Sequence, residues 1–289
     1  MDQAVVIPCQ GQQMVGILHQ PEGPAQIGLV VVVAGGPQYR VGVSRQFVML
    51  GREMAARGFP TLRFDHRGVG DSGGEYKGFV DMSADIRSAV DCIFEQCPDL
   101  QSIVLWGECE SATAVSFYAH SDERISGIFL VNPWIRTEEG QAKTYIRHYY
   151  RKRLLSKAFW NKILSGKVDF VGSAKSFVDL LRRSSNSRKQ AITEQSVEAS
   201  LQSLPLPQRL EKTTGLFQGR IDILTSGRDF IAQEFKDFVS QSAGWKQILQ
   251  RQNAQMAEIA DADHSFSRIE WREQLFNKIA AALLSVRGK

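Results

Sequence analysis

Residues 102–114 read S-I-V-L-W-G-E-C-E-S-A-T-A, and they combine an apolar strand, a sharp turn and a helix of small residues. This arrangement predicts a nucleophile elbow, in which small neighbours allow a strained turn to present a reactive side chain at the start of a helix. Cys109 occupies that position. The dipole and the free N–H groups of the helix N-terminus favour the thiolate, which is the nucleophilic form of cysteine. The stretch therefore predicts a reactive site centred on Cys109.

Two features of this elbow depart from the usual G-x-nucleophile-x-G pattern. Glu108 and Glu110 flank Cys109, and their negative charges would oppose a thiolate if both were ionised and close. Ser111 stands where the pattern has glycine, and serine is small enough to be a variant there. The alternative interpretation is that Cys109 is only a small buried residue at the end of a strand. Its partners along the chain favour the catalytic interpretation.

Those partners follow two later strands. Asp229 comes after a predicted strand at 219–225, and His264 comes after a predicted short strand at 257–259. Elbow nucleophiles of this kind are followed by their acid and then by their histidine. We therefore expect His264 to take the thiol proton and Asp229 to orient the imidazolium. Three other aspartates are only fallback choices for the acid. Asp222 lies inside a strand, and Asp261 and Asp263 lie too near His264 in sequence.

An oxyanion hole needs two N–H donors. One is expected from Glu110, the residue after the nucleophile, and the other from the loop after the first long strand. That loop is A-G-G-P-Q-Y, residues 34–39. Because Pro37 has no N–H, Gly36 is the expected donor, and Gln38 is the alternative in a shifted register.

The order of elements predicts an α/β fold with a mainly parallel central sheet and helices on both faces. The run G-L-V-V-V-V-A at 28–34 is typical of a central strand that is buried on both faces. Ser44 is expected to cap the helix that follows it. The other strands are expected at 4–8 and 13–20 as an antiparallel pair, and at 60–65, 102–106, 127–131, 219–225 and 257–259. Further helices are expected at 82–93, 111–119, 233–240 and 275–283.

The alternation of strands and helices breaks at residues 134–207, which are basic, aromatic and compatible with helices. We expect a helical lid there, inserted into an α/β core of residues 1–133 and 208–289. Ligands of such sheets bind at the carboxyl ends of the strands, so lid side chains would line the substrate pocket. An aromatic stripe is alternatively the lid's own core. The candidate pocket residues are Gln38, Tyr145, Tyr149, Phe159 and Trp160.

Composition limits the partners of the protein. No apolar run approaches the ~18 to 20 residues of a membrane span, and the first twenty residues lack the features of a secretory signal. We expect a cytoplasmic protein with reduced cysteines, and neither a metal nor an organic cofactor is indicated.

The net charge of +4 comes largely from clusters in 136–167 and 182–189. These clusters are typical of a solvated helix face or, alternatively, of a surface for anionic lipid or polysaccharide, whereas no nucleic-acid-binding motif is present. The oligomeric state is not indicated.

A glycine-rich segment, F-D-H-R-G-V-G-D-S-G-G at 64–74, lacks the spacing of a nucleotide-binding loop. We interpret it as a structural loop beside the active site. Asp65 and Arg67 are expected to form an internal polar pair that braces the loop, and His66 is expected to be exposed.

These segments, together with S-G-R-D at 226–229 and D-H-S-F at 263–266, resemble the α/β-hydrolase superfamily in the right order. The stretch V-V-V-A-G-G to D-S-G-G at 31–74 and the cysteine elbow are more closely similar to the exosortase A system-associated hydrolase 1 family. The elbow is also similar to that of dienelactone hydrolases.

The resemblance implies an α/β-hydrolase fold and an acyl hydrolase that acts on ester or thioester bonds, in a bacterial setting of exopolysaccharide and exosortase genes. Its substrate would be a small molecule or an acyl group on a lipid or glycan. Two alternatives keep the same fold. One is an acyltransferase that acts on a glycan or lipid-linked precursor, and the other is a non-catalytic binding protein.

Overall fold

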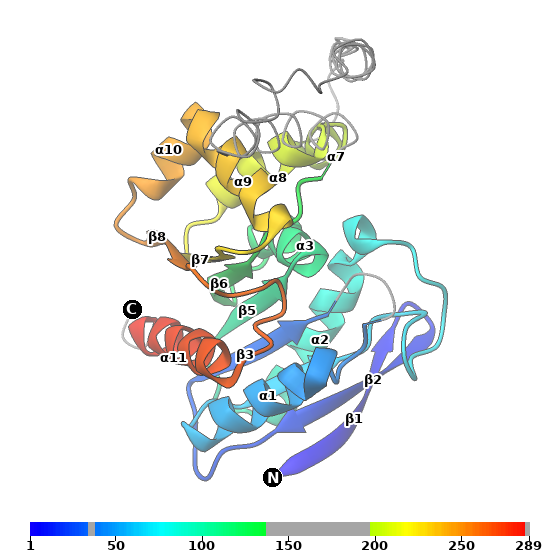
Figure 1. Ribbon diagram of the computed structural model, residues 1–289. Coiled ribbons are helices and arrows are strands. Elements are labelled where there is room, and N and C mark those ends of the chain that lie inside the picture. The colour runs from blue at the N-terminus through cyan, green and yellow to red at the C-terminus, as the bar shows by residue number, and fades with distance from the viewer. Residues whose placement is uncertain (34–37, 137–196, 287–289) are drawn as a thin grey trace, which may run out of the picture. The chain divides into compact units, whose positions relative to one another are not determined.

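The computed structural model describes residues 1–33, 38–136 and 197–286 of the chain (Figure 1). The chain divides into two compact units, residues 1–135 with 207–289 and residues 136–206. Most of the predicted lid lies outside the described residues, so its helical structure stays a prediction. In the second unit the structure describes one short helix, α7 (Val197–Gln202). None of the described helices is long and apolar enough to cross a membrane.

An eight-stranded sheet forms the centre of the first unit, in the order β1-β2-β4-β3-β5-β6-β7-β8. Strand β2 is antiparallel to both of its neighbours, β1 and β4, whereas the run β4-β3-β5-β6-β7-β8 is parallel. This arrangement is the mainly parallel sheet that the sequence predicts. The strands are β1 (Asp2–Cys9), β2 (Gln12–His19), β3 (Ile27–Val32), β4 (Thr61–Phe64), β5 (Ser102–Glu108), β6 (Ile125–Val131), β7 (Arg220–Ser226) and β8 (Ala254–Ile259).

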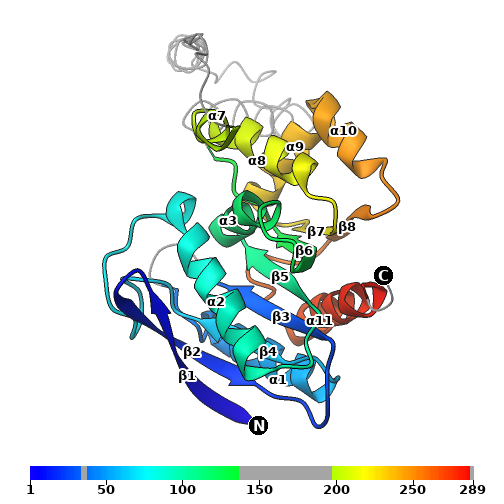
Figure 2. The same ribbon diagram turned by 180° about the vertical axis from the view of Figure 1, so that it is seen from behind.

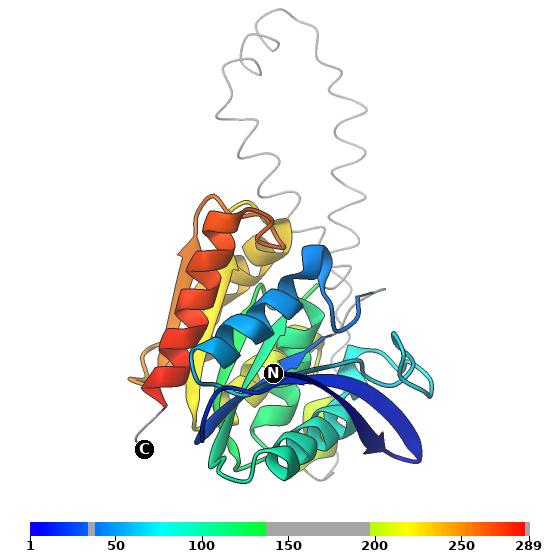
Figure 3. The ribbon, with the colours of Figure 1, turned by 90° about the horizontal axis from the view of Figure 1, so that it is seen from below.

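Helices cover both faces of this sheet. The helices are α1 (Gln46–Ala56), α2 (Ser83–Gln96), α3 (Glu110–Ala119), α8 (Leu206–Leu216), α9 (Phe230–Gln241), α10 (Ala243–Leu249) and α11 (Ile269–Ser285). Helices α1 and α11 lie next to each other on one face (Figure 3). Seen from behind, α2 and α3 lie in front of the strands on the other face (Figure 2).

Strand β3 shows why the central run of the sequence is apolar throughout. Successive side chains of a strand point to opposite faces. Leu29 and Val31 belong to the apolar cluster that contains residues of α1 and α11. Gly28 faces the other way, and a Cβ at this position would lie 3.2 Å from a methyl carbon of Ile93 in α2. Both faces of β3 are therefore covered, as the sequence predicts.

Ser44 does not cap α1, in contrast to the prediction. It lies in a short 3-10 turn, Val43–Arg45, with a φ of 52°. The carbonyl oxygen of Val41 accepts the N–H of Phe47, at 3.2 Å, near the start of α1. Because a backbone carbonyl satisfies this free N–H, a capping hydroxyl is not needed.

Helix α8 begins where the sequence suggested only the end of the lid. The pair Pro205 and Pro207 indicated a break, but Pro207 lies in the first turn of α8. A proline is tolerated there, because its missing N–H would have no helical acceptor. Helix α10 was also not predicted.

Candidate active site

The nucleophile elbow lies between β5 and α3. Cys109 has a φ of 60° and a ψ of −122°, a conformation that is strained for any residue other than glycine. Its N–H donates to the carbonyl oxygen of Val131 at 2.8 Å, and its carbonyl oxygen accepts the N–H of Trp134 at 3.2 Å. The last residue of β6 and the backbone after it therefore bind the N–H and the carbonyl oxygen of Cys109. The side chain is partly exposed.

The residues around Cys109 explain how so tight a turn forms. A Cβ on Gly107 would lie 2.5 Å from the carbonyl oxygen of Ser111, so only glycine fits here. The hydroxyl of Ser111 accepts the N–H of Glu108 and donates to the carbonyl oxygen of Glu108, each at 2.8 Å. The serine that replaces the usual glycine thus braces the elbow. Because Ser111 is buried and its hydroxyl is engaged on the backbone, Cys109 is the more accessible nucleophile of the two.

The structure brings the predicted acid and base together. Nδ1 of His264 lies 2.8 Å from Oδ2 of Asp229. Asp229 follows β7 and is also the N-cap of α9, where its carboxylate accepts the N–H groups of Ile231 at 3.2 Å and Ala232 at 3.1 Å. The sequence left open whether this aspartate was an acid or a helix cap, and the geometry allows it to be both.

Cys109 also acts on the pKa of His264, so the three predicted residues interact with one another. Burial lowers the pKa of His264, but its hydrogen bond to Asp229, the neighbouring Cys109 and the charges of Asp229 and Glu108 together raise it to about 10. Burial acts to raise the pKa of Asp229, but the hydrogen bonds from His264 and from the start of α9 hold it below the ordinary value. The geometry therefore favours an imidazolium between a carboxylate and the sulfur.

The two glutamates that flank Cys109 differ in their surroundings. Glu108 is only 9% exposed. Its Oε2 lies 3.5 Å from Nε2 of Gln46, and its Oε1 has no hydrogen-bond partner within the described part of the chain. Burial raises the pKa of Glu108 to about 7, against the opposing effect of the His264 charge. Burial also raises the pKa of the half-buried Glu110. Each shift reduces the negative charge that would oppose a thiolate.

One of the two predicted oxyanion donors can be located. Glu110 is the first residue of α3, so its N–H has no acceptor within the helix. Gly36 lies outside the described residues, and its role stays a prediction. Gln38 is described and is half-buried in the loop after β3. The N–H of Arg40 anchors this loop by donating to Asp65 at 2.6 Å, and its guanidinium pairs with the same carboxylate.

A row of hydrogen bonds between polar side chains reaches this loop from the edge of the sheet. Nδ1 of His19 lies 2.7 Å from Oδ1 of Asp2, and Nε2 of His19 accepts the Nε–H of Arg63 at 2.8 Å. Arg63 in turn donates to the carbonyl oxygen of Arg40 at 2.9 Å. Burial and the nearby Arg63 charge lower the pKa of His19. This row of hydrogen bonds therefore needs a neutral His19, whose imidazole accepts the hydrogen bond from Arg63.

Two predictions about the glycine-rich segment 64–74 are wrong. Asp65 and Arg67 do not pair with each other, because Asp65 binds Arg40 and Arg67 binds Asp85 at 2.8 Å. His66 is buried rather than exposed, and its Nδ1 lies 3.2 Å from the carbonyl oxygen of Arg67. Asp65 and Arg67 thus each bind a partner outside the segment, whereas His66 contacts the backbone within it. The interpretation of the segment as a structural loop that braces the site remains the better one.

Asn132 is a further residue of the site that the sequence did not predict. This residue follows β6, has a φ of 44°, and is completely buried. Its Oδ1 accepts the N–H of Ser226 at 2.8 Å, and its Nδ2 donates to Oγ of Ser226 at 2.9 Å and to the carbonyl oxygen of His264 at 3.2 Å. A polar residue directly after a buried strand, at the edge where the site lies, was the available signal.

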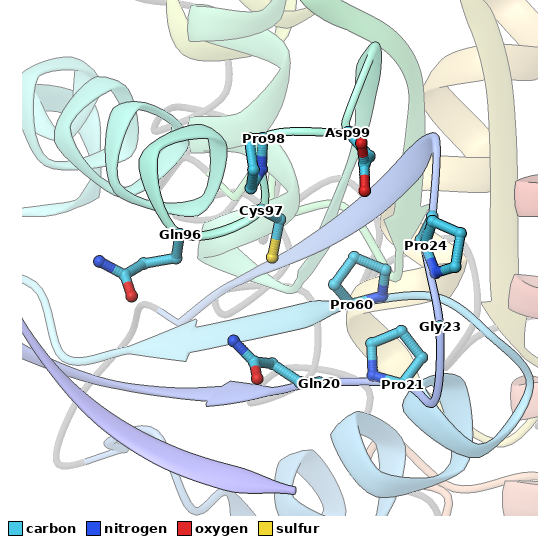
Figure 4. A pocket seen from close by; sticks show the side chains of 10 residues that line it. Gln20, Pro21, Gly23, Pro24, Pro60, Gln96, Cys97, Pro98 and Asp99 are labelled. Carbon is cyan, nitrogen blue, oxygen red and sulfur yellow. The ribbon is translucent and has the colours of Figure 1, made fainter.

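A cavity of about 180 Å³ is lined by residues that do not belong to the candidate site (Figure 4). Its lining residues precede β3, β4 and β5 or follow β2, at the amino ends of the parallel strands, whereas Cys109 lies at a carboxyl end. They are Gln20, Pro21, Gly23, Pro24, Ala25, Pro60, Gln96, Cys97, Pro98 and Asp99. This cavity is not the predicted substrate pocket.

Four of the predicted pocket residues lie outside the described residues, and their role stays a prediction: Tyr145, Tyr149, Phe159 and Trp160. In the described ranges, no group of three histidine, cysteine, aspartate or glutamate side chains could hold a metal ion.

Comparisons with known proteins agree with this fold. The model of a family described as serine aminopeptidase, S33, matches residues 25–265. No curated protein matches the sequence. A solved esterase from Pyrococcus furiosus is 15% identical with a TM-score of 0.65, over 100% of this chain and 92% of that one. Est1E from Butyrivibrio proteoclasticus with bound ferulic acid is 16% identical with a TM-score of 0.62, over 99% and 100%.

A putative alpha/beta hydrolase from Agrobacterium tumefaciens is also similar, with 14% identity, a TM-score of 0.56 and coverage of 97% of this chain and 94% of that one. At such low identities these similarities concern the fold. They confirm the fold class that the sequence predicts.

Proposed function

From the premise that the chain belongs to the serine aminopeptidase S33 family of α/β-hydrolases, we propose that it hydrolyses ester or thioester bonds through an acyl intermediate on Cys109. The observation that carries the proposal is the strained elbow at Cys109, together with a histidine that is paired with Asp229 and whose pKa Cys109 helps to raise. The family is named after a serine enzyme, whereas this chain has cysteine at the position of the nucleophile. A thiolate paired with an imidazolium can supply the same chemistry.

In the first step, His264 holds the proton of the Cys109 thiol as an imidazolium, and the thiolate attacks the substrate carbonyl carbon. A carbon–sulfur bond forms, and the carbonyl π electrons move to the oxygen. The N–H of Glu110 and the predicted donor Gly36 stabilise this oxyanion. When the oxyanion collapses, the bond to the leaving alcohol or thiol breaks, and the leaving group takes the proton from His264.

In the second step, His264 takes a proton from water while the water oxygen attacks the acyl carbon. Collapse of the second oxyanion breaks the carbon–sulfur bond and releases the carboxylic acid. Cys109 returns to the thiolate, and His264 is again protonated. Asp229 stays ionised throughout and stabilises the imidazolium, as its low pKa requires.

The choice of esters rests on two similar solved proteins, an esterase and a protein with bound ferulic acid. The finer setting rests on resemblance in sequence. The segment 31–74 and the cysteine elbow are similar to exosortase A system-associated hydrolases. We therefore place the substrate among acyl groups of small molecules, lipids or glycans that are linked to exopolysaccharide systems, in the cytoplasm.

A second candidate function keeps the same acyl-enzyme but passes the acyl group to an acceptor hydroxyl. The basic clusters in 136–167 and 182–189 favour it, because they suit anionic lipid or polysaccharide surfaces. Adding glycan or lipid-linked acceptors during turnover of a p-nitrophenyl ester would divert acyl groups into a new ester. Release of free acid alone with every acceptor would favour the hydrolase.

The test of the main proposal is mass spectrometry after mixing the protein with a short-chain p-nitrophenyl ester or a CoA thioester. We expect an acyl group on the peptide that contains Cys109, and loss of both the adduct and turnover in Cys109→Ala. Cys97→Ala is the matched control, because it removes another partly buried free thiol, far from the elbow. Unchanged turnover in Cys109→Ala would overturn the proposal.

A further inference from the structure

Asn132 lies where three parts of the site meet. Its left-handed φ of 44° is a conformation that asparagine tolerates better than most residues. All of its described side-chain hydrogen bonds go to the ends of other elements, namely to Ser226 at the end of β7 and to the backbone of His264 after β8. Its own N–H donates to the carbonyl oxygen of Leu224 at 2.9 Å. The completely buried side-chain amide of Asn132, after β6, thus connects by hydrogen bonds to the end of β7 and to the backbone after β8.

The same short segment also holds the nucleophile. Val131, directly before Asn132, accepts the N–H of Cys109, and Trp134 donates to the carbonyl oxygen of Cys109. Residues 131–134 therefore contact the backbone of Cys109 on one side and the backbone of His264 on the other. The distance between the sulfur and the imidazole depends on this segment.

Two other described contacts link the acid and base loops but do not reach the elbow. The N–H of Gly227 donates to the carbonyl oxygen of Ile259, and the N–H of Arg228 donates to that of Ala262, both at 3.0 Å. They keep the acid loop near the His264 loop. The amide of Asn132 connects this pair of loops to the strand end that carries the contacts of Cys109.

We propose that Asn132 is a positioning residue that sets the separation of Cys109 and His264 for proton transfer. The inference rests on the proposed function, because it assigns Asn132 a part in the same acyl transfer. Misplacing a catalytic group by about 1 Å costs on the order of 100-fold in rate. Removing this amide should therefore impair the chemistry more than the binding of substrate.

The experiment compares three variants. Asn132→Gly accepts the left-handed backbone and removes only the side chain, whereas Asn132→Ala adds backbone strain. Asn132→Asp keeps the shape and the acceptor for the N–H of Ser226, but in its ionised form it loses the hydrogen bonds donated by Nδ2.

Asn253→Ala is the matched control. It removes an amide that donates to the carbonyl oxygens of Gln218 at 2.9 Å and Gly219 at 2.6 Å, near the amino end of β7.

The readouts are kcat and KM with a p-nitrophenyl ester, the melting temperature, and the rate of iodoacetamide alkylation at Cys109, followed on its own peptide across pH. We expect Asn132→Gly and Asn132→Asp to lower both kcat and the alkylation rate by about 10- to 100-fold with little change in KM. Asn253→Ala should lower the melting temperature while kcat stays within about twofold of the wild type.

If Asn132→Gly changes the melting temperature as Asn253→Ala does but leaves kcat and alkylation unchanged, Asn132 is merely structural and the inference is wrong. The failure of the proposed function looks different. In that case Cys109→Ala retains full turnover, whatever the Asn132 variants do to alkylation.

Discussion

Replacing Glu108 by glutamine should make the protein more stable at pH 8. The carboxyl is buried, and one of its oxygens has no hydrogen-bond partner among the described residues. Burial raises the pKa of Glu108 from 4.5 to about 7. Because a tenfold change in a proton equilibrium corresponds to about 1.4 kcal/mol, this difference corresponds to about 3 kcal/mol of unfolding free energy.

The sign follows from the raised pKa. Below pH 4.5 the carboxyl is protonated in both the folded and the unfolded state, so its burial does not lower the unfolding free energy in this way. As the pH rises to about 7 the unfolded chain loses its proton first, so the folded state loses stability, and above this pH the full cost remains. Glutamine stays neutral and can still accept from Gln46. We therefore expect Glu108→Gln to gain about 2 to 3 kcal/mol at pH 8 and almost nothing near pH 4.5.

Urea unfolding of both proteins at pH 4.5 and pH 8 measures this difference directly. Glu75→Gln is the control, because it removes a carboxyl that is exposed. The reasoning is refuted if Glu108→Gln is no more stable than the wild type at pH 8, or if its advantage is the same at both pH values. Either result would mean that burial does not penalise the charge of Glu108.

Two further substitutions test the acid and the elbow. Asp229→Asn keeps a residue that can cap α9 but removes the charge that contributes to raising the pKa of His264 to about 10. The imidazolium should then be lost at a lower pH, so at pH 8 both ester turnover and iodoacetamide alkylation of Cys109 should fall by at least about tenfold, and an unchanged pH profile would contradict this. Ser111→Ala removes two hydrogen bonds to the backbone of Glu108 and should lower the unfolding free energy by about 1 to 3 kcal/mol in urea titrations. If instead it abolished turnover while Cys109→Ala did not, the nucleophile would have been placed at the wrong residue of the elbow.

The sheet and the meeting of the three predicted residues could be anticipated from local patterns. Cys109, Asp229 and His264 each follow a strand of the parallel part of the sheet, and the carboxyl ends of parallel strands lie at one edge. Continuous apolar runs identify the strands, so the edge where the side chains meet follows from strand order alone. No knowledge of side-chain contacts was needed.

The errors came from interactions that no local pattern specifies. Asp65 and Arg67 are two residues apart, but each binds a partner that the folding of a loop brings near. His66 is also buried, which its place in a glycine-rich segment did not suggest. The position of Asn132 after a buried strand was the only signal for it in sequence, because its role depends on the ends of three strands that are adjacent only in the sheet. The start of α8 was hidden because a proline can mark either a break or a first turn.

His19 and His264 respond to acid in opposite ways. The folded chain favours the charged form of His264, but it favours the neutral form of His19, which must accept from Arg63. Folded-state stability from His19 is present above pH 6.5 and is lost as the pH falls below this value, because the unfolded chain takes up the proton more readily. Acid thus weakens the support of the loop after β3, through Arg63 and Arg40, while His264 keeps its proton. The loop after β3 is therefore sensitive to acid through a histidine of β2, and not through the predicted base of the site.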